Sequence, residues 1–237
     1  MYLKKICYNI GKCDGDYMSE FILIVMLLII GSTMFLMHQF LEKFGLKIML
    51  ILLTIISLIM SFKIGIILGI DTNVNIIPYM SVFTLFYILF EKYNQKEVSN
   101  NLGLITKTSI YSTIVFALFI VYTQSINDSI SLNINHIISI FTSFIPILLL
   151  PVFLIATNKL YNYLKTINEN ININIIMCTI SIGLIESIIG AIISNILILD
   201  INQIIHIALA NYLLKIITII MSLPIIYAIL NKKKVLL

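Results

Sequence analysis

Residues 81–100, SVFTLFYILFEKYNQKEVSN, contain the sharpest boundary in the chain and decide its fold class. Ten mostly apolar residues run without a break into Glu91-Lys92-Tyr93, and a polar run of Asn, Gln, Lys and Glu follows. An apolar segment that ends in charged residues and a tyrosine is typical of a transmembrane helix that has reached the membrane surface. The stretch therefore predicts the end of a membrane span, with Tyr87 one helical turn before Glu91.

The composition of the whole chain also indicates a membrane protein. Of its 237 residues, 60% are hydrophobic and 11% are charged, and the mean hydropathy is +1.07. Because a soluble domain carries about 25% charged residues, the composition argues against a soluble fold. All 15 basic residues are lysines, and the heavy use of Ile, Asn and Lys is typical of an AT-rich genome. The net charge of +4 therefore does not indicate a nucleic-acid partner.

Apolar windows of bilayer-spanning length recur along the chain. They predict seven spans, at 21–41, 47–70, 74–91, 104–124, 136–157, 173–199 and 207–230. Helices must form these spans, because every backbone N–H in hydrocarbon needs a partner within the protein. The predicted fold class is therefore an all-α integral membrane protein, a polytopic bundle of six to seven transmembrane helices.

The lysines predict how the bundle is oriented. They occur in the first, third and fifth connections between predicted spans and in the C-terminal tail, whereas the other three connections contain none. Since cytoplasmic loops carry an excess of lysine, we expect a multi-pass protein of the plasma membrane with its C-terminus in the cytoplasm. The lipid bilayer is then its first partner.

The N-terminal tail, residues 1–17, does not fit this orientation, because its lysines would lie on the outer side. One hypothesis is that Met18 is the native start, since the codons for GDYM at 15–18 could include a ribosome-binding sequence directly before an ATG. The alternative is a tail that departs from a statistical rule. In either case residues 18–237 are expected to form a single transmembrane transporter domain.

Three charged side chains are predicted within the spans: Lys63, Glu186 and Lys215. A charge in the bilayer costs about 2.5–3.5 kcal/mol on the insertion scale, so such residues indicate functional sites. We expect both lysines roughly 10–12 Å below the outer surface and Glu186 near the midplane. The three could line one cavity that opens outward. Alternatively, Lys63 extends to the surface and Glu186 pairs with Lys215.

No pattern in the chain indicates an enzyme. The three cysteines and three histidines are dispersed, at Cys7, Cys13, Cys178, His38, His136 and His206. They form neither a disulfide framework nor a metal-ligand spacing, and no hydrolase motif is present. We therefore expect no catalytic activity, no metal site and no cofactor.

Two segments resemble the queuosine precursor transporter (VUT) family. At the end of the third predicted span, Glu91, Tyr93 and Lys96 match the family signature T-D-x-x-x-E-x-Y-G-x-K-x-A. Lys63 stands where the family has the lysine of an A-N-x-x-x-x-K segment.

Two further segments extend the resemblance to nearly the whole chain. The stretch 210–230, ANYLLKIITIIMSLPIIYAIL, resembles a Y-x-x-K segment followed by D-x-P-x-x-Y, and the matching residues are Tyr212, Lys215, Pro224 and Tyr227. The stretch 181–188, SIGLIESI, resembles Q-x-I-D-[ST], with Glu186 in the place of the Asp.

The chain departs from the family pattern at several polar positions. Tyr87 replaces the signature Asp, and Ser222 replaces the Asp before the last proline. The other replacements are Phe86 for Thr, Asn94 for Gly, Leu58 for Asn and Gly183 for Gln. The chain thus resembles a divergent member that keeps the fold and has an altered polar site.

The resemblance implies a transporter that imports a queuosine precursor, a 7-deazaguanine such as preQ0 or preQ1, or the free base queuine. Such a flat polar ligand needs stacking aromatics and a few hydrogen-bonding groups. The candidate substrate-binding residues are Lys63, Glu186, Lys215, Tyr79, Tyr87 and Tyr212. Glu186 could bind the aminopyrimidinone edge or the ammonium of preQ1, and the lysines could donate to the ring carbonyl. Tyr87 could stack on the base or simply pack.

Two other functions stay open. No ATP-binding signature is present, so the chain could be a carrier, or the substrate-binding component of a separately energised, vitamin-type uptake system. It could instead be a degenerate paralogue that serves as a non-transporting membrane partner or scaffold. The retained intramembrane charges argue against the scaffold, because they are costly to keep without use. A separate energising module or a second copy of the chain are the possible protein partners.

Overall fold

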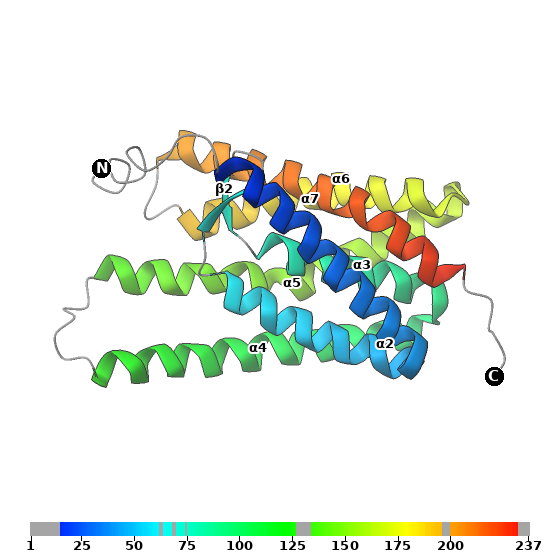
Figure 1. The fold of residues 1–237 in the computed structure, drawn as a ribbon, viewed down its shortest axis with the longest axis horizontal. Helices are drawn as coiled ribbons and strands as arrows, with labels where there is room; N and C mark the ends of the chain where they lie inside the picture. Colours follow the sequence, from blue (N-terminus) through cyan, green and yellow to red (C-terminus); the bar gives the residue numbers. More distant parts are fainter. Residues whose placement is uncertain are drawn as a thin grey trace.

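The computed structural model describes six helices and one β-hairpin (Figure 1). The described residues are 15–61, 64–67, 70–73, 75–126, 134–195 and 200–231. Lys63, one of the predicted site residues, and residues 1–14 of the predicted tail lie outside these ranges. In chain order the elements are α2 (Gly15–Met60), β1 (Ile64–Ile67), β2 (Ile70–Asn73), α3 (Ile76–Lys92), α4 (Gln95–Ile126), α5 (Ile134–Ile167), α6 (Ile171–Asn195) and α7 (Ile201–Leu230).

The described helices are those of a membrane protein. Five are long and apolar enough to cross a membrane, by length and composition: Ile24–Met60 in α2, Gln95–Phe119 in α4, Phe144–Ile167 in α5, and the whole of α6 and α7. The prediction of a helical membrane protein is therefore confirmed. The predicted count of seven spans is wrong, because the described part of the chain contains five such helices.

Two features of the N-terminal half explain the difference in count. The first predicted span and most of the second lie in α2, which has a non-helical residue at Glu42. At this point the helix reverses, and its two arms run in opposite directions (dark and light blue in Figure 1). The third predicted span is α3, which has only 17 residues and is shorter than the roughly 20 residues that a bilayer requires.

The second predicted span also ends earlier than expected. It was predicted to continue to residue 70, but α2 ends at Met60, and β1 and β2 pair as an antiparallel hairpin. Ile64 lies opposite Asn73, and Ile67 lies opposite Ile70. This segment is rich in β-branched residues, which favour strands, and it contains glycines, which weaken helices. An apolar window cannot distinguish such a short hairpin from the end of a helix.

The reversal in α2 gives a prediction about stability. Glu42 has φ 44° and ψ −120°, a conformation that glycine adopts more readily than other residues and that costs them on the order of 1–3 kcal/mol. Glu42→Gly removes this strain, but glycine also loses more conformational entropy on folding, which offsets part of the gain. We therefore expect the substitution to raise the free energy of unfolding by about 1 kcal/mol. Phe44→Gly, in the helical arm that follows, should lower it by about 1 kcal/mol. Equal losses from both substitutions in a denaturation experiment would contradict the strained turn.

The short helix α3 forms the core of the bundle. All its residues from Ile76 to Phe90 are buried, and it contacts α2, α4, α5 and α7. Its sequence suits this position, because a helix that is hydrophobic on every side lies either in a protein core or in a membrane. Its bulky side chains include Phe83, Phe86 and Tyr87, and they leave no polar face for water. Polar groups on α3 can therefore meet only the helices that surround it.

The lysine-bearing connections gather at one end of the bundle, which we call the lysine-rich end. This end contains the reversal of α2, the α3–α4 and α5–α6 connections and the end of α7, all at the right of Figure 1. Glu97 forms ion pairs with Lys43 and Lys47 there. Lys43 also lies 5.9 Å from the ring centroid of Tyr93. The connections that were predicted to share one side of the membrane because they contain lysines therefore lie together at one end of the bundle.

Candidate functional site: a buried ion pair in the helical bundle

The strongest candidate for a functional site is a buried ion pair between α6 and α7. The ammonium nitrogen of Lys215 lies 3.1 Å from a carboxylate oxygen of Glu186. The two side chains are only 8% and 6% exposed. Two charges in so dry a place attract strongly, but each has lost its hydration, which costs several kcal/mol per ion. The pairing of Glu186 with Lys215, one of the two predicted arrangements, is therefore observed.

Helical spacing explains why these side chains meet. On α6, Thr179, Gly183 and Glu186 are all buried, and residues three or four apart lie on one face of a helix. On α7, Lys215, Thr218 and Ser222 are buried with the same spacing. These polar faces point into the bundle, while apolar residues such as Leu213 and Ile185 face outward and are half exposed.

Tyr79, near the start of α3, completes the site. Its ring centroid lies 5.6 Å from the Lys215 ammonium, a distance at which the ring face attracts a cation. Its hydroxyl lies close to the Glu186 carboxylate and interacts with it, although the geometry is not that of a well-formed hydrogen bond. The buried hydroxyl of Ser187, next to Glu186, forms no hydrogen bond within the described residues. Buried polar groups normally have partners, so the Ser187 hydroxyl is an exception among the described residues.

Two more polar contacts join α3 to neighbouring helices, between the Glu186–Lys215 ion pair and the lysine-rich end. The Thr84 hydroxyl donates to the Ser222 hydroxyl on α7 at 3.1 Å. The Tyr87 hydroxyl lies 3.3 Å from that of Thr179 on α6. Ser222 and Tyr87 both stand where the family resemblance expects an acid. In this chain they form neutral hydrogen bonds between helices and do not add charge to the site.

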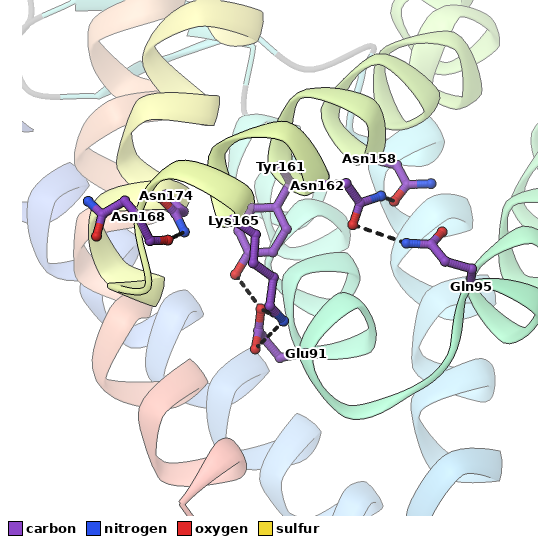
Figure 2. A network of polar contacts seen from close by, with 8 residues as sticks. All are labelled: Glu91, Gln95, Asn158, Tyr161, Asn162, Lys165, Asn168 and Asn174. Carbon is purple, nitrogen blue, oxygen red and sulfur yellow. Dashed lines mark hydrogen bonds and ion pairs between the residues drawn. The ribbon is translucent and has the colours of Figure 1, made fainter.

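At the lysine-rich end, Glu91 forms a third polar contact, this time with α5. One carboxylate oxygen of Glu91 accepts a hydrogen bond from the Tyr161 hydroxyl at 2.7 Å and one from the Lys165 ammonium at 2.9 Å. Figure 2 shows both side chains converging on this carboxylate. Tyr161 and Lys165 were not among the predicted site residues. Their four-residue spacing near the end of a predicted span was the available signal.

The structure brings together only some of the predicted site residues. Glu186, Lys215 and Tyr79 meet, whereas Tyr87 lies two helical turns further along α3. Tyr212 is only partly buried, and no described contact joins it to the ion pair. Lys63 lies outside the described residues.

The position of Lys215 along its helix differs from the prediction. It was expected about one third of the way along its span, but α7 begins at Ile201 and ends at Leu230. Lys215 therefore lies at the middle of α7, because the helix extends further than the apolar window that defined the span. This central position places Lys215 further from the start of its helix than expected, while its distance from the helix end at Leu230 is unchanged.

The matched family-signature residues lie mainly away from the ion pair. Tyr93, between α3 and α4, is partly buried at the lysine-rich end, where its burial and the carboxylates of Glu42 and Glu97 raise its pKa. Lys96 is exposed at the same end. On α7, Pro224 lies within the helix and Tyr227 is 61% exposed. Of the matched residues in that segment, only Lys215 enters the interior.

The described part of the chain contains no group of three or more His, Cys, Asp or Glu placed to hold a metal ion. What the ion pair can do is exchange partners. A solute with hydrogen-bond donors could bind the carboxylate, and an acceptor on the same solute could bind the ammonium. Such an exchange keeps both charges paired, which a dry site requires.

No family model, curated protein or solved structure matches the chain. Membership of the queuosine precursor transporter family therefore stays a prediction from the sequence segments quoted above.

Proposed function

We propose that this chain is a membrane transporter that imports a queuosine precursor, either a 7-deazaguanine such as preQ0 or preQ1 or the free base queuine. The observation that carries the proposal is the Glu186–Lys215 ion pair, buried beside Tyr79 inside a helical membrane protein. Ionisable residues in membrane spans are expensive, and they commonly mark the path of a solute. The family resemblance supplies the class of solute.

The chemistry of the solute fits the groups around the pair. A 7-deazaguanine has N–H donors on its aminopyrimidinone edge and a ring carbonyl as acceptor. In our proposal Glu186 accepts from the N–H groups, Lys215 donates to the carbonyl, and the ring of Tyr79 offers a surface for stacking. The hydroxyls of Tyr79 and Ser187 complete the hydrogen bonds. A solute that lacked either edge would leave one charge unpaired, and this is costly in a buried site.

The lysine distribution supports a direction for this transport. We propose that the lysine-rich end faces the cytoplasm, since cytoplasmic loops carry the excess of lysine. The solute would then enter from the end that carries the β1–β2 hairpin, and the C-terminus would lie in the cytoplasm of a cell with this protein in its plasma membrane.

The experiment that tests this function measures queuosine in tRNA. The chain is expressed in a bacterial host that lacks both precursor synthesis and its own transporter, and preQ0, preQ1 and queuine are supplied separately at low concentration, with a salvage enzyme for queuine. We expect queuosine to return with at least one precursor. If queuosine stays absent although the protein is in the membrane, a carrier that works alone with these solutes is ruled out. A separately energised uptake system or a non-transporting partner would then be favoured.

A further inference from the structure

A cluster of aromatic rings separates the ion pair from the lysine-rich end. The ring centroids of Tyr87 and Phe90 on α3 each lie 5.5 Å from that of Tyr161 on α5. Tyr87 and Tyr161 are both 1% exposed, and Phe90 is 8% exposed. The hydrogen bond between the hydroxyls of Tyr87 and Thr179 closes the cluster against α6. These rings therefore fill the space between α3, α5 and α6.

The distance of this cluster from the ion pair can be estimated along α3 and, independently, along α6. Tyr87 lies eight residues beyond Tyr79 on α3, which is about 12 Å at 1.5 Å per residue. Thr179 lies seven residues before Glu186 on α6, or about 10 Å. Both helices thus place the rings roughly two turns from the ion pair, in the direction of the lysine-rich end. A solute that leaves the ion pair toward this end would meet the rings first.

The Glu91 contact holds this cluster in place from the outside. Glu91 is one residue beyond Phe90, and its carboxylate binds the hydroxyl of Tyr161, whose ring belongs to the cluster. Lys165 adds two contacts to the same carboxylate, at 2.9 and 3.1 Å. Figure 2 shows that these contacts join α3 to the last turns of α5. Hydrogen bonds to an ionised carboxylate are among the stronger ones in proteins.

Helix α5 also contains a point at which it can bend. Pro146 and Pro151 lie within this helix, and a proline in a helix interior removes a backbone hydrogen bond and favours a kink. Pro151 precedes Tyr161 by about three turns. The segment of α5 that carries Tyr161 and Lys165 can therefore move relative to the rest of the helix once the Glu91 contact is broken.

We propose that Glu91, Tyr161 and Lys165 form the latch of a gate at the lysine-rich end, and that the rings of Tyr87, Phe90 and Tyr161 are the gate itself. The described structure is the closed state. The inference rests on the proposed function in one respect, namely that the passage leads from the Glu186–Lys215 pair. Opening requires that Tyr161 leave Glu91, and its ring then withdraws from α3.

The chain contains a natural reporter for this gate. Cys178 is free, fully buried and next to Thr179 on α6, and its thiol lies near enough to Tyr87 and Tyr161 to interact with both. Its thiol can react with a maleimide only when the rings separate. With Cys7→Ser and Cys13→Ser as background in the full chain, Cys178 is the sole cysteine. The rate of its labelling therefore measures gate opening, and no solute is needed.

The test compares labelling rates in sealed membrane vesicles, with a charged maleimide that cannot cross the membrane. We expect slow labelling of the background protein, and labelling about tenfold faster in Glu91→Gln and Tyr161→Phe. The increase should occur only when the reagent reaches the lysine-rich end, in one of the two vesicle orientations. Gln95→Ala is the matched control, because it removes a 3.0 Å hydrogen bond between α4 and α5 at the same end without touching the latch. Its labelling rate should equal that of the background.

Three results would overturn the gate. One is unchanged labelling in both latch variants. Another is faster labelling from both sides of the membrane, and a third is an equal increase in Gln95→Ala, since either would indicate general loosening of the bundle. A size-exclusion profile of each variant confirms that the folded protein is being labelled. Because no solute takes part, failure of this test leaves the proposed solute untouched, and failure to restore queuosine leaves the gate untouched.

Discussion

Lys215→Met is expected to lower the free energy of unfolding by about 3–5 kcal/mol, the typical cost of removing one member of a buried ion pair. The substitution leaves the Glu186 carboxylate without its cation in a site that is 6% exposed. Glu186→Met should cost a similar amount, because the Lys215 ammonium is then unpaired. Chemical denaturation of each purified variant in detergent, monitored by circular dichroism, measures both losses in the free energy of unfolding.

The double variant Glu186→Met/Lys215→Met should recover most of this stability, since apolar residues of similar volume replace a buried ion pair at little cost or with a gain. Lys165→Met is the matched control. Lys165 also pairs with a glutamate, but its side chain is 49% exposed and Glu91 keeps its hydrogen bond from Tyr161 without it, so we expect a loss of about 1 kcal/mol. If the double variant lost as much free energy of unfolding as the two single variants together, Glu186 and Lys215 would not be energetically coupled, and this prediction would be wrong.

Phe86→Ala is expected to be the most damaging substitution among the apolar residues of α3, with a loss on the order of 3 kcal/mol. Phe86 is 0% exposed, and its ring packs edge-on against Phe90 with centroids 5.3 Å apart. In a membrane the loss comes mainly from the cavity and from lost packing contacts, because lipid is as apolar as the protein interior. The same denaturation experiment measures it.

Phe40→Ala is the control for this prediction. Phe40 lies on α2 and is 77% exposed, so its removal leaves no cavity, and we expect a change within about 0.5 kcal/mol. Similar losses from the two substitutions would show that α3 is not the packed centre of the bundle.

Some of this structure could be predicted from the sequence, because the bilayer imposes strong rules. The hydrophobic runs predicted membrane helices correctly, and the lysines correctly predicted which connections share one end. The pairing of Glu186 with Lys215 could also be foreseen as one of two alternatives, since an unpaired charge is too costly in a membrane interior.

Other features depend on long-range contacts that a hydrophobic window cannot detect. The break at Glu42 falls in the predicted connection between the first two spans, with Gly45 three residues later, but the hairpin that shortens the second span could not be predicted. The strand at 64–67 is as apolar as a helix end, whereas the strand at 70–73 contains Asp71, Thr72 and Asn73. The spacing of Tyr161 and Lys165 places them on one helix face but does not reveal their partner, and the contact of Tyr161 with Glu91 joins residues 70 positions apart. Only the packing of α3 against α5 brings these side chains together.

The central claim is that the Glu186–Lys215 pair binds the transported solute. The most direct measurement is uptake of labelled preQ1 by liposomes that contain either the purified chain or the stability-restored double variant Glu186→Met/Lys215→Met. Because the double variant keeps the fold and lacks both charges, we expect the native chain to transport preQ1 and the double variant to transport none above the level of empty liposomes. Equal uptake by the two proteins would show that the ion pair only supports the fold.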